Sequence, residues 1–489
     1  MDSLAPESPD ESPDPKRASS LIASSPKMLL WLVAIGFFME TLDSTIVNTA
    51  LPSMAQSLGE SPLMMQAVII AYTLTLAVFI PASGWLADRF GTKKTYFSAI
   101  VLFTIGSLFC ALSQTLPQLV LARVLQGCGG CMLLPVGRLA VLRAFPGDRF
   151  LEALSFVTMP ALIGPVLGPS LGGWLVEYAS WHWIFLINLP IGIIGCIATW
   201  VAMPESESSR ERKFDFAGFL QISLFMVSIL FALDGLSELN LSQGTVLLLL
   251  FLGFAALVSY ILRASRQAEP LFSLSLFKVR TFTVGILGNL FARVGTSAIP
   301  FLIPLFLQLS LAYSPFQAGL TMLPIAIASI LAKRIVSPAV RRVGYRNFLV
   351  WNTLLVGAGI ASFALVTAEQ PAWVRIIQLF LFGIVNSMQF TAMNTLTLKD
   401  LDKAKTSGGN ALFSMIQMLA ISFAVAVAGA LLTAFMERFN VHLHPEMTLR
   451  AFHTTFLCMG GITCTSAWIF WQIPENVKTK IDQSVSLEQ

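Results

Sequence analysis

Long apolar stretches follow one another along most of the chain, and short polar segments separate them. A helix needs about 20 mostly apolar residues to cross the hydrocarbon core of a bilayer. Fourteen stretches meet this requirement, and they lie near residues 28–50, 63–86, 94–113, 117–142, 150–175, 181–203, 215–233, 244–263, 282–309, 316–336, 347–368, 372–396, 407–436 and 451–473. The pattern therefore predicts an all-α polytopic membrane protein with 14 transmembrane helices.

Composition agrees with this pattern and excludes several classes of protein. Of the 489 residues, 55% are apolar and 12% are charged, whereas about 25% are charged in soluble domains. The basic residues form short scattered groups, so we expect no nucleic acid partner. The chain has neither a glycine-rich phosphate loop nor a nucleophile–base arrangement, so we expect neither ATP drive nor an enzyme. We also expect no metal site.

The placement of lysine and arginine predicts the orientation of the chain, because basic residues favour cytoplasmic loops. With the amino terminus inside, most of the 31 Lys and Arg residues fall in inner segments. Arg138 and Arg143, at the end of the fourth stretch, are among them. Few fall in outer segments, Arg375 being one. We therefore expect both termini in the cytoplasm.

The two parts of the chain share an internal repeat. The segment 57–62 recurs at 310–315, and the segment 89–93 recurs at 342–346, each 253 residues later. Two similar halves, with two further helices between them, are typical of transporters that alternate access to a site near the membrane midplane. The predicted domains, in order, are a disordered cytoplasmic tail (1–27), an N-terminal six-helix bundle (28–208), two inserted central helices (209–267), a C-terminal six-helix bundle (268–474) and a cytoplasmic tail (475–489).

Four charged residues lie well away from the ends of predicted spans, where a charge is costly and marks a candidate functional site. Glu40 and Asp43 are three residues apart in the first stretch and share one helical face. We predict that these two carboxylates bind and release protons. Arg123 must face the interior and find an acidic or carbonyl partner. Arg293 occupies the repeat position of Glu40, and we hypothesise that the two pair across a central cavity.

Four motifs resemble those of one transporter family. They are the first-span segment 42–52, the loop 84–94, the fourth-span segment 121–127 and the Gly/Pro-rich segment 164–173. The residues that define the loop and the Gly/Pro-rich motif are Gly84, Asp88, Arg89, Gly91, Gly164, Pro165, Gly168, Pro169, Gly172 and Gly173. Together the motifs resemble the major facilitator superfamily and, within it, the fourteen-span drug:proton antiporters.

This resemblance implies a major facilitator fold in the inner (cytoplasmic) membrane of a bacterium. It implies a monomeric exporter of small organic compounds that uses the proton gradient and no cofactor, and whose partners are substrate, protons and lipid bilayer. Arg123 would take part in proton transfer.

The two defined motifs each have a functional and a structural interpretation. Asp88 would cap the next helix or act as a latch that holds one conformation. The second half has Arg341 at this repeat position, so we do not expect the same carboxylate latch there. The Gly/Pro-rich fifth span would seal one side of the transporter or simply be a bent packing helix.

Polar residues within the spans are candidates for lining a substrate cavity, although many such side chains only join helices by hydrogen bonds. The candidates are Arg293, Asn289, Gln126, Asn386, Asn394 and Asn410. The arginines leave room for an exporter of organic acids, metal chelates or siderophores with the same fold. A second alternative is a membrane sensor that has kept the fold without transport.

Overall fold

A computed structural model of the chain describes residues 26–60, 64–145, 148–205, 213–237, 242–441 and 445–474. Every regular element in these ranges is helical. The two predicted tails lie outside them, apart from Pro26 and Lys27.

Most of the N-terminal half consists of long helices joined by short turns. Its elements are α2 (Pro26–Leu58), α3 (Gln66–Phe79), η1 (Ile80–Ala82), α4 (Ser83–Phe90), α5 (Thr92–Leu112), α6 (Leu116–Ala144), α7 (Asp148–Tyr178), α8 (Trp183–Leu186) and α9 (Asn188–Ala202). Gly91 separates α4 from α5 with a φ of 83° and a ψ of 153°. Glycine adopts this positive φ without steric cost because it has no Cβ.

The C-terminal half has a similar build. Its elements are η2 (Leu274–Lys278), α12 (Arg280–Phe291), α13 (Arg293–Leu311), α14 (Pro315–Thr321), α15 (Leu323–Val343), α16 (Tyr345–Ser362), η3 (Phe363–Leu365), α17 (Ala372–Lys399), α18 (Lys403–Arg438), η4 (Pro445–Met447), α19 (Thr448–Thr465) and α20 (Ala467–Trp471). Gly344, at the repeat position of Gly91, has a φ of 79° and a ψ of 157°. The backbone therefore repeats at the turn where the sequence repeats.

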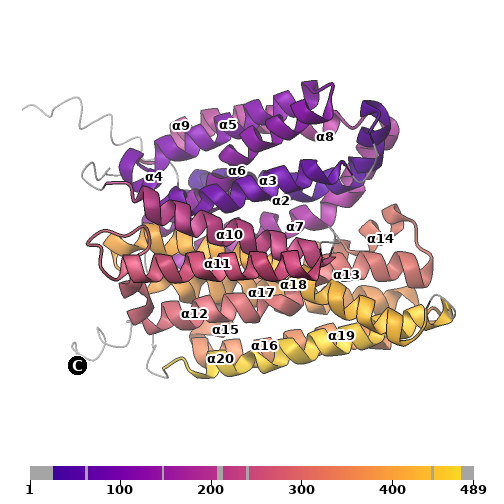
Figure 1. Cartoon of the computed structure of the whole chain (residues 1–489). Helices are drawn as coiled ribbons and strands as arrows, with labels where there is room; N and C mark the ends of the chain where they lie inside the picture. Colours follow the sequence, from indigo (N-terminus) through magenta and orange to yellow (C-terminus); the bar gives the residue numbers. More distant parts are fainter. Residues whose placement is uncertain are drawn as a thin grey trace, which may run out of the picture.

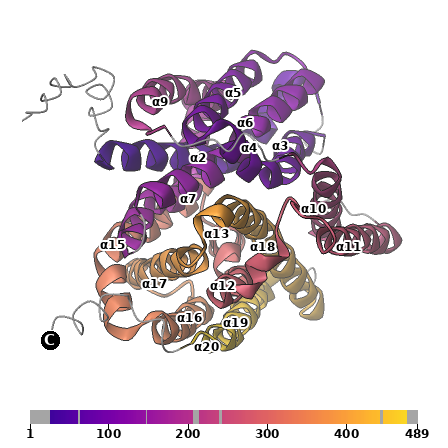
Figure 2. The same ribbon diagram turned by 90° about the vertical axis from the view of Figure 1, so that its left-hand side faces the viewer.

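Two central helices, α10 (Phe216–Ser237) and α11 (Gln243–Ala264), connect the halves. Asp215 fixes their ends, since its carboxylate accepts hydrogen bonds from Arg263 at 2.8 Å and from the backbone N–H groups of Gly218 and Leu271. Helix α10 contacts α3 of one half and α18 of the other. The pair therefore lies against both bundles at the edge of the molecule, as the end-on view shows (Figure 2).

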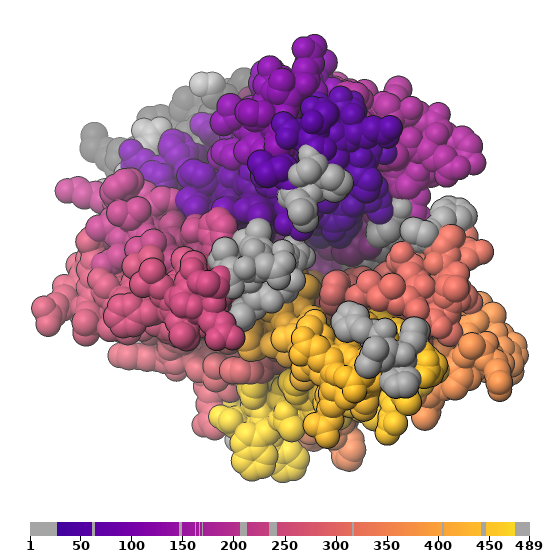
Figure 3. Space-filling view, turned by 45° about the vertical axis from the view of Figure 1, so that its right-hand side comes forward, coloured from indigo at the N-terminus to yellow at the C-terminus, as the bar shows by residue number. Residues whose placement is uncertain are grey.

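The axes of the long helices lie nearly along one common line, with the chain passing back and forth between the two ends (Figure 1). The N-terminal half, in indigo and purple, lies on one side, and the C-terminal half, in orange and yellow, lies on the other (Figures 1 and 3). Large apolar side chains cover the outside, and Phe251 of α11 is 73% exposed. Such a surface suits a lipid environment.

Within the described ranges, twelve helices are long and apolar enough to cross a membrane. Two segments of α7, Arg149–Pro165 and Ser170–Tyr178, meet at a bend of 51° and make a thirteenth if they form one span. The last predicted stretch is helical as α19 and α20. The polytopic all-α class is confirmed, while the count of fourteen spans, the domain boundaries and the orientation of the termini stay predictions.

Candidate functional site

Asp43 lies at the centre of a buried polar network inside the N-terminal half. Its side chain is fully buried, and Arg123 of α6 donates to it at 2.7 Å. Gln126 and Asn188 donate to its other carboxylate oxygen at 2.8 Å and 2.9 Å. Ser107 of α5 accepts from both amide groups. Four helices, α2, α5, α6 and α9, therefore place their polar side chains around one carboxylate.

The guanidinium group of Arg123 is held from several sides. It donates to Gln126 at 2.6 Å and to the backbone carbonyl of Val68 at 3.4 Å. The ring of Tyr72 stacks on it, with 4.0 Å between Arg123 Cζ and the ring centroid. Such stacking on an aromatic face is favourable for a desolvated cation. Arg123 thus meets the acidic partner that its position in the membrane requires.

Three members of this network, Asn188, Ser107 and Tyr72, are absent from the set selected from the sequence. The sequence signal for Asn188 is a polar amide next to a Leu-Pro step at the start of an apolar stretch. The signal for Ser107 and Tyr72 is weaker, because small hydroxyls and tyrosines are common in helices that only pack together.

Glu40 lies one helical turn before Asp43, and its environment differs. It is 7% exposed, and it forms no hydrogen bond or ion pair with any residue that the structure describes. The hypothesis that Glu40 pairs with Arg293 is wrong here, because Arg293 donates to Asn289 at 3.0 Å and to Asn394 at 3.3 Å instead. The guanidinium group of Arg293 is thus bound by amide side chains of the C-terminal half.

A second buried network joins the two halves. Arg138 of α6 donates to Gln417 of α18 at 2.6 Å, and Gln417 donates to Asn394 of α17 at 3.3 Å. Arg293 donates to the same oxygen of Asn394. Arg138, which the sequence assigned to an inner segment, lies within α6, since this helix continues to Ala144, and it is only 2% exposed.

The other candidate cavity residues divide among several places. Asn289 bonds to Thr397 within the C-terminal half, at 3.2 Å. Asn410 donates across the halves to the carbonyl of Pro135 at 2.6 Å. Gln126 belongs to the Asp43 network rather than to the inter-half network. Asn386 is half-buried and makes no hydrogen bond in the described part of the chain.

The loop motif forms a contact between the halves. Arg143 donates to Asp88 and to Ser407 of α18, both at 2.8 Å, and Ser407 also donates to Asp88. Arg89 is half-buried beside this group. A Cβ on Gly84 would lie 2.7 Å from the carbonyl oxygen of Ser407. The absence of a side chain at Gly84 thus lets α4 and α18 approach closely.

The Gly/Pro-rich motif packs α7 against α2. Gly164, Gly168 and Gly172 lie every four residues and so form one helical stripe, and a Cβ on each would collide with a threonine hydroxyl of α2. The three hydroxyls belong to Thr41, Thr45 and Thr49. Gly173 faces open space, Pro165 is half-buried, and the side chain of Pro169 lies outside the described set. The structure therefore supports a packing role for the stripe.

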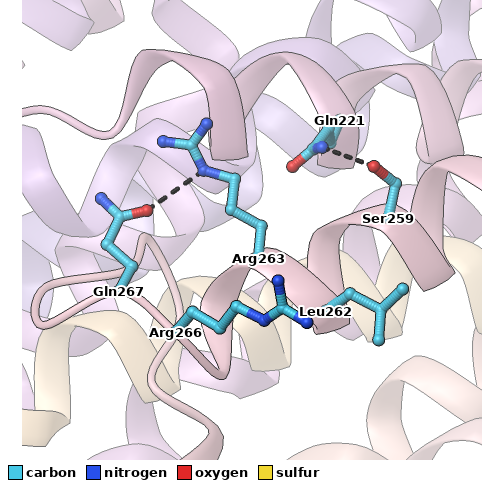
Figure 4. Close-up of a pocket in the computed structure, with 6 residues that line it drawn as sticks. All are labelled: Gln221, Ser259, Leu262, Arg263, Arg266 and Gln267. Atoms are coloured by element: carbon cyan, nitrogen blue, oxygen red, sulfur yellow. Dashed lines mark hydrogen bonds between the residues drawn. The ribbon is translucent and has the colours of Figure 1, made fainter.

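An open recess with a volume of about 570 Å³ lies between α10 and α11 (Figure 4). Gln221, Ser259, Arg263, Arg266 and Gln267 line it together with Leu262. All of these residues belong to the central helices and the segment after them, so the recess is separate from both networks. The described residues contain no cluster of ligands that could hold a metal ion.

Comparison with known proteins gives the family. Residues 33–425 and 287–485 match the family described as Major Facilitator Superfamily. The chain belongs to this superfamily. Because its members are transporters, the chain is a membrane transporter of small molecules and not an enzyme.

Curated relatives match almost the whole chain. A "Putative multidrug resistance protein MdtD" from Pectobacterium atrosepticum is 50% identical over 92% of this chain and 96% of its own length. The protein of that name from Escherichia coli K12 is 49% identical over 94% of this chain and 97% of its own. The chain is accordingly a multi-pass protein of the bacterial inner membrane.

Two solved structures share the fold. The human organic anion transporter MFSD10 (TETRAN) has a TM-score of 0.63 at 11% identity and covers 91% of this chain and 99% of its own. The proton:xylose symporter XylE has a TM-score of 0.61 at 14% identity and covers 95% of this chain and 99% of its own. At these identities the likeness shows the fold alone, and it confirms the predicted major facilitator fold.

Proposed function

We propose that this transporter is a proton-coupled antiporter that exports small organic compounds from the cytoplasm. The observation that carries this proposal is the contrast between two neighbouring buried carboxylates. Asp43 has a counter-charge in Arg123, whereas Glu40 has no partner among the described residues. A buried carboxylate without a partner is costly as an ion, and a bound proton removes that cost. Glu40 is therefore suited to hold a proton in this conformation.

Arg123 supplies a link between protonation and structure. A proton on Asp43 would remove the counter-charge of Arg123, and a buried cation left without its partner is strongly unfavourable. Relief would come from movement of α6 relative to α2, since these helices carry the two charges. A proton can shift the balance of two conformations in this way when it favours one of them. The names of the relatives support small organic compounds as the substrates.

Substrate-induced proton movement in everted membrane vesicles tests this proposal, with a panel of drugs and organic acids as substrates. We expect Asp43→Asn and Glu40→Gln each to lower proton movement at least tenfold. Glu177→Gln serves as the matched control, because Glu177 is an exposed carboxylate of α7 in the same half. Its proton movement should equal that of the wild type.

Two results would contradict the proposal in different ways. Proton movement that survives in the Asp43→Asn/Glu40→Gln double variant would show that coupling occurs elsewhere. If the wild-type protein moves no compound of the panel, with or without a proton gradient, the result would favour the alternative of a membrane sensor that does not transport.

A further inference from the structure

Two buried arginines lie between the halves without a counter-charge. Arg138 and Arg293 are 2% and 6% exposed, and neither forms an ion pair with a described carboxylate. Each is electrostatically costly to bury in this state. Both belong to one hydrogen-bonded network through Gln417 and Asn394, so their like charges repel each other. Two uncompensated cations in one place suit the binding of an anion.

The amides that bridge the arginines do not supply that charge. Gln417 and Asn394 are neutral, and the oxygen of Asn394 is shared between donors from Gln417 and Arg293. Hydrogen bonds from a guanidinium group to amide oxygens lower the cost of its burial, but they supply no negative charge to balance it. The network therefore orients the guanidinium groups and leaves their charge uncompensated.

Unused polar atoms gather at the same place. Arg138 Nε and Asn394 Nδ2 are buried donors without a hydrogen-bond partner, and Asn410 Oδ1 is a buried acceptor without one. Buried polar atoms in folded proteins are nearly always satisfied by protein, ordered water or ligand, so these three atoms are available to a further partner. Two donors and one acceptor on three helices suit a ligand with carboxylate or phosphate oxygens and a hydroxyl group.

One aromatic ring stacks on each guanidinium group. Arg138 Cζ lies 4.5 Å from the ring centroid of Phe413, and Arg293 Cζ lies 4.3 Å from that of Phe390. One face of each group is thus covered. The N–H edges already donate in part to amide and hydroxyl oxygens, and Arg138 Nε remains without a protein partner. Those edges form a fork that matches the two oxygens of a carboxylate or phosphate.

We propose that Arg138 and Arg293 form the substrate site and that it takes organic anions with at least two acidic groups. This inference rests on the proposed transport function and specifies its substrate class. Arg293 lies 13 residues into the candidate span Arg280–Leu311, about 20 Å along the helix, and hence well inside a hydrocarbon core of about 30 Å. A site between the halves at this depth suits alternating access. Lipophilic cations would be repelled by the same two charges.

Ligand-induced thermal shifts of the purified full-length protein test the site. The probes are linear dicarboxylates from malonate to adipate, glycerol 3-phosphate, acetate and tetraphenylphosphonium. We expect dicarboxylates of one preferred length to raise the melting temperature, and acetate and tetraphenylphosphonium to leave it unchanged. A shift with glycerol 3-phosphate alone would overturn the requirement for two acidic groups and would assign the site to phosphate esters. Arg138→Gln and Arg293→Gln should each weaken the apparent affinity at least tenfold.

Arg375→Gln is the matched control. Arg375 is also largely buried, but it lies at the start of α17 and donates to Tyr313 and the carbonyl of Thr367 within one half. This variant should keep the full ligand shift. A dicarboxylate shift that persists in both site variants would overturn the site. Absence of any shift with the acidic probes would overturn the substrate class.

A structural role for the two arginines predicts a different result without ligand. If they only tie the helices together, Arg138→Gln and Arg293→Gln should lower the melting temperature of the empty protein. If they await an anion, the loss of an uncompensated charge should leave that temperature unchanged or raise it. The proposed antiport stands separately, since drugs that drive Asp43-dependent proton movement would support it even if no acidic compound binds.

Discussion

At Asp43, removal of one member of the ion pair should cost more than removal of both. Arg123→Gln leaves a buried carboxylate without its counter-charge, and the loss of one partner from a buried pair destabilises by about 3–5 kcal/mol. The double variant Asp43→Asn/Arg123→Gln leaves two neutral amides in the same space. We expect it to melt at a higher temperature than Arg123→Gln alone, as measured by thermal denaturation of the purified protein in detergent.

The exposed pair of Arg341 and Glu152 is the control for this cycle. The guanidinium and carboxylate groups are 2.8 Å apart, and the two side chains are 49% and 55% exposed. Exposed pairs contribute about 0–1 kcal/mol to stability. Removal of Arg341 alone should therefore change the melting temperature little. A double variant at Asp43 and Arg123 that melts as low as Arg123→Gln, or lower, would show that the network depends on hydrogen bonds rather than on charge balance.

Among the helices, the contact between α2 and α7 depends on the glycine stripe. Gly168→Ala places a methyl group against the hydroxyl of Thr45 and 3.2 Å from the backbone nitrogen of Ile46. Overpacking of this kind costs about 1–3 kcal/mol, so the melting temperature and the transport rate should both fall. Gly173→Ala, in the same helix but facing open space, should leave both unchanged. Equal behaviour of the two variants would contradict the packing role.

The helices themselves were predictable, because the length of an apolar stretch is a local property. The shared face of Glu40 and Asp43 was also predictable, since helical periodicity fixes it. The residues on other helices that bind these side chains were not predictable. Asn188 lies 145 residues from Asp43 in the sequence, and no local pattern connects them. The burial of Arg138 was not predictable either, because it depends on the contact of α6 with α18 and not on the local sequence.

Each half of the molecule contributes a related end-of-span contact to the other half, although the sequence predicted no second carboxylate latch of the Asp88 kind. Asp88, after the second span of the first half, contacts Ser407 at the start of α18. Arg341, at its repeat position, contacts Glu152 at the start of α7 in the opposite half. The charge of the end-of-span residue is reversed, and its position is retained. As expected, the second half has an arginine and not a carboxylate at this position. The sequence did not predict that Arg341 would contact the opposite half, where Glu152 supplies the carboxylate.

A charge swap at the contact between Arg341 and Glu152 tests whether this ion pair holds the halves together. Arg341→Glu places two carboxylates together and should widen the separation between spin labels at Lys94 and Asn347, which are exposed, repeat-related positions at the starts of α5 and α16. Because an exposed pair contributes about 0–1 kcal/mol, the shift in population should be at most about fivefold. Glu152→Arg/Arg341→Glu restores the attraction with opposite polarity, so its label distances should return to those of the wild type. Distances that stay wide in the swap, or that never change in the single variant, would mean that other contacts keep these ends of the halves together.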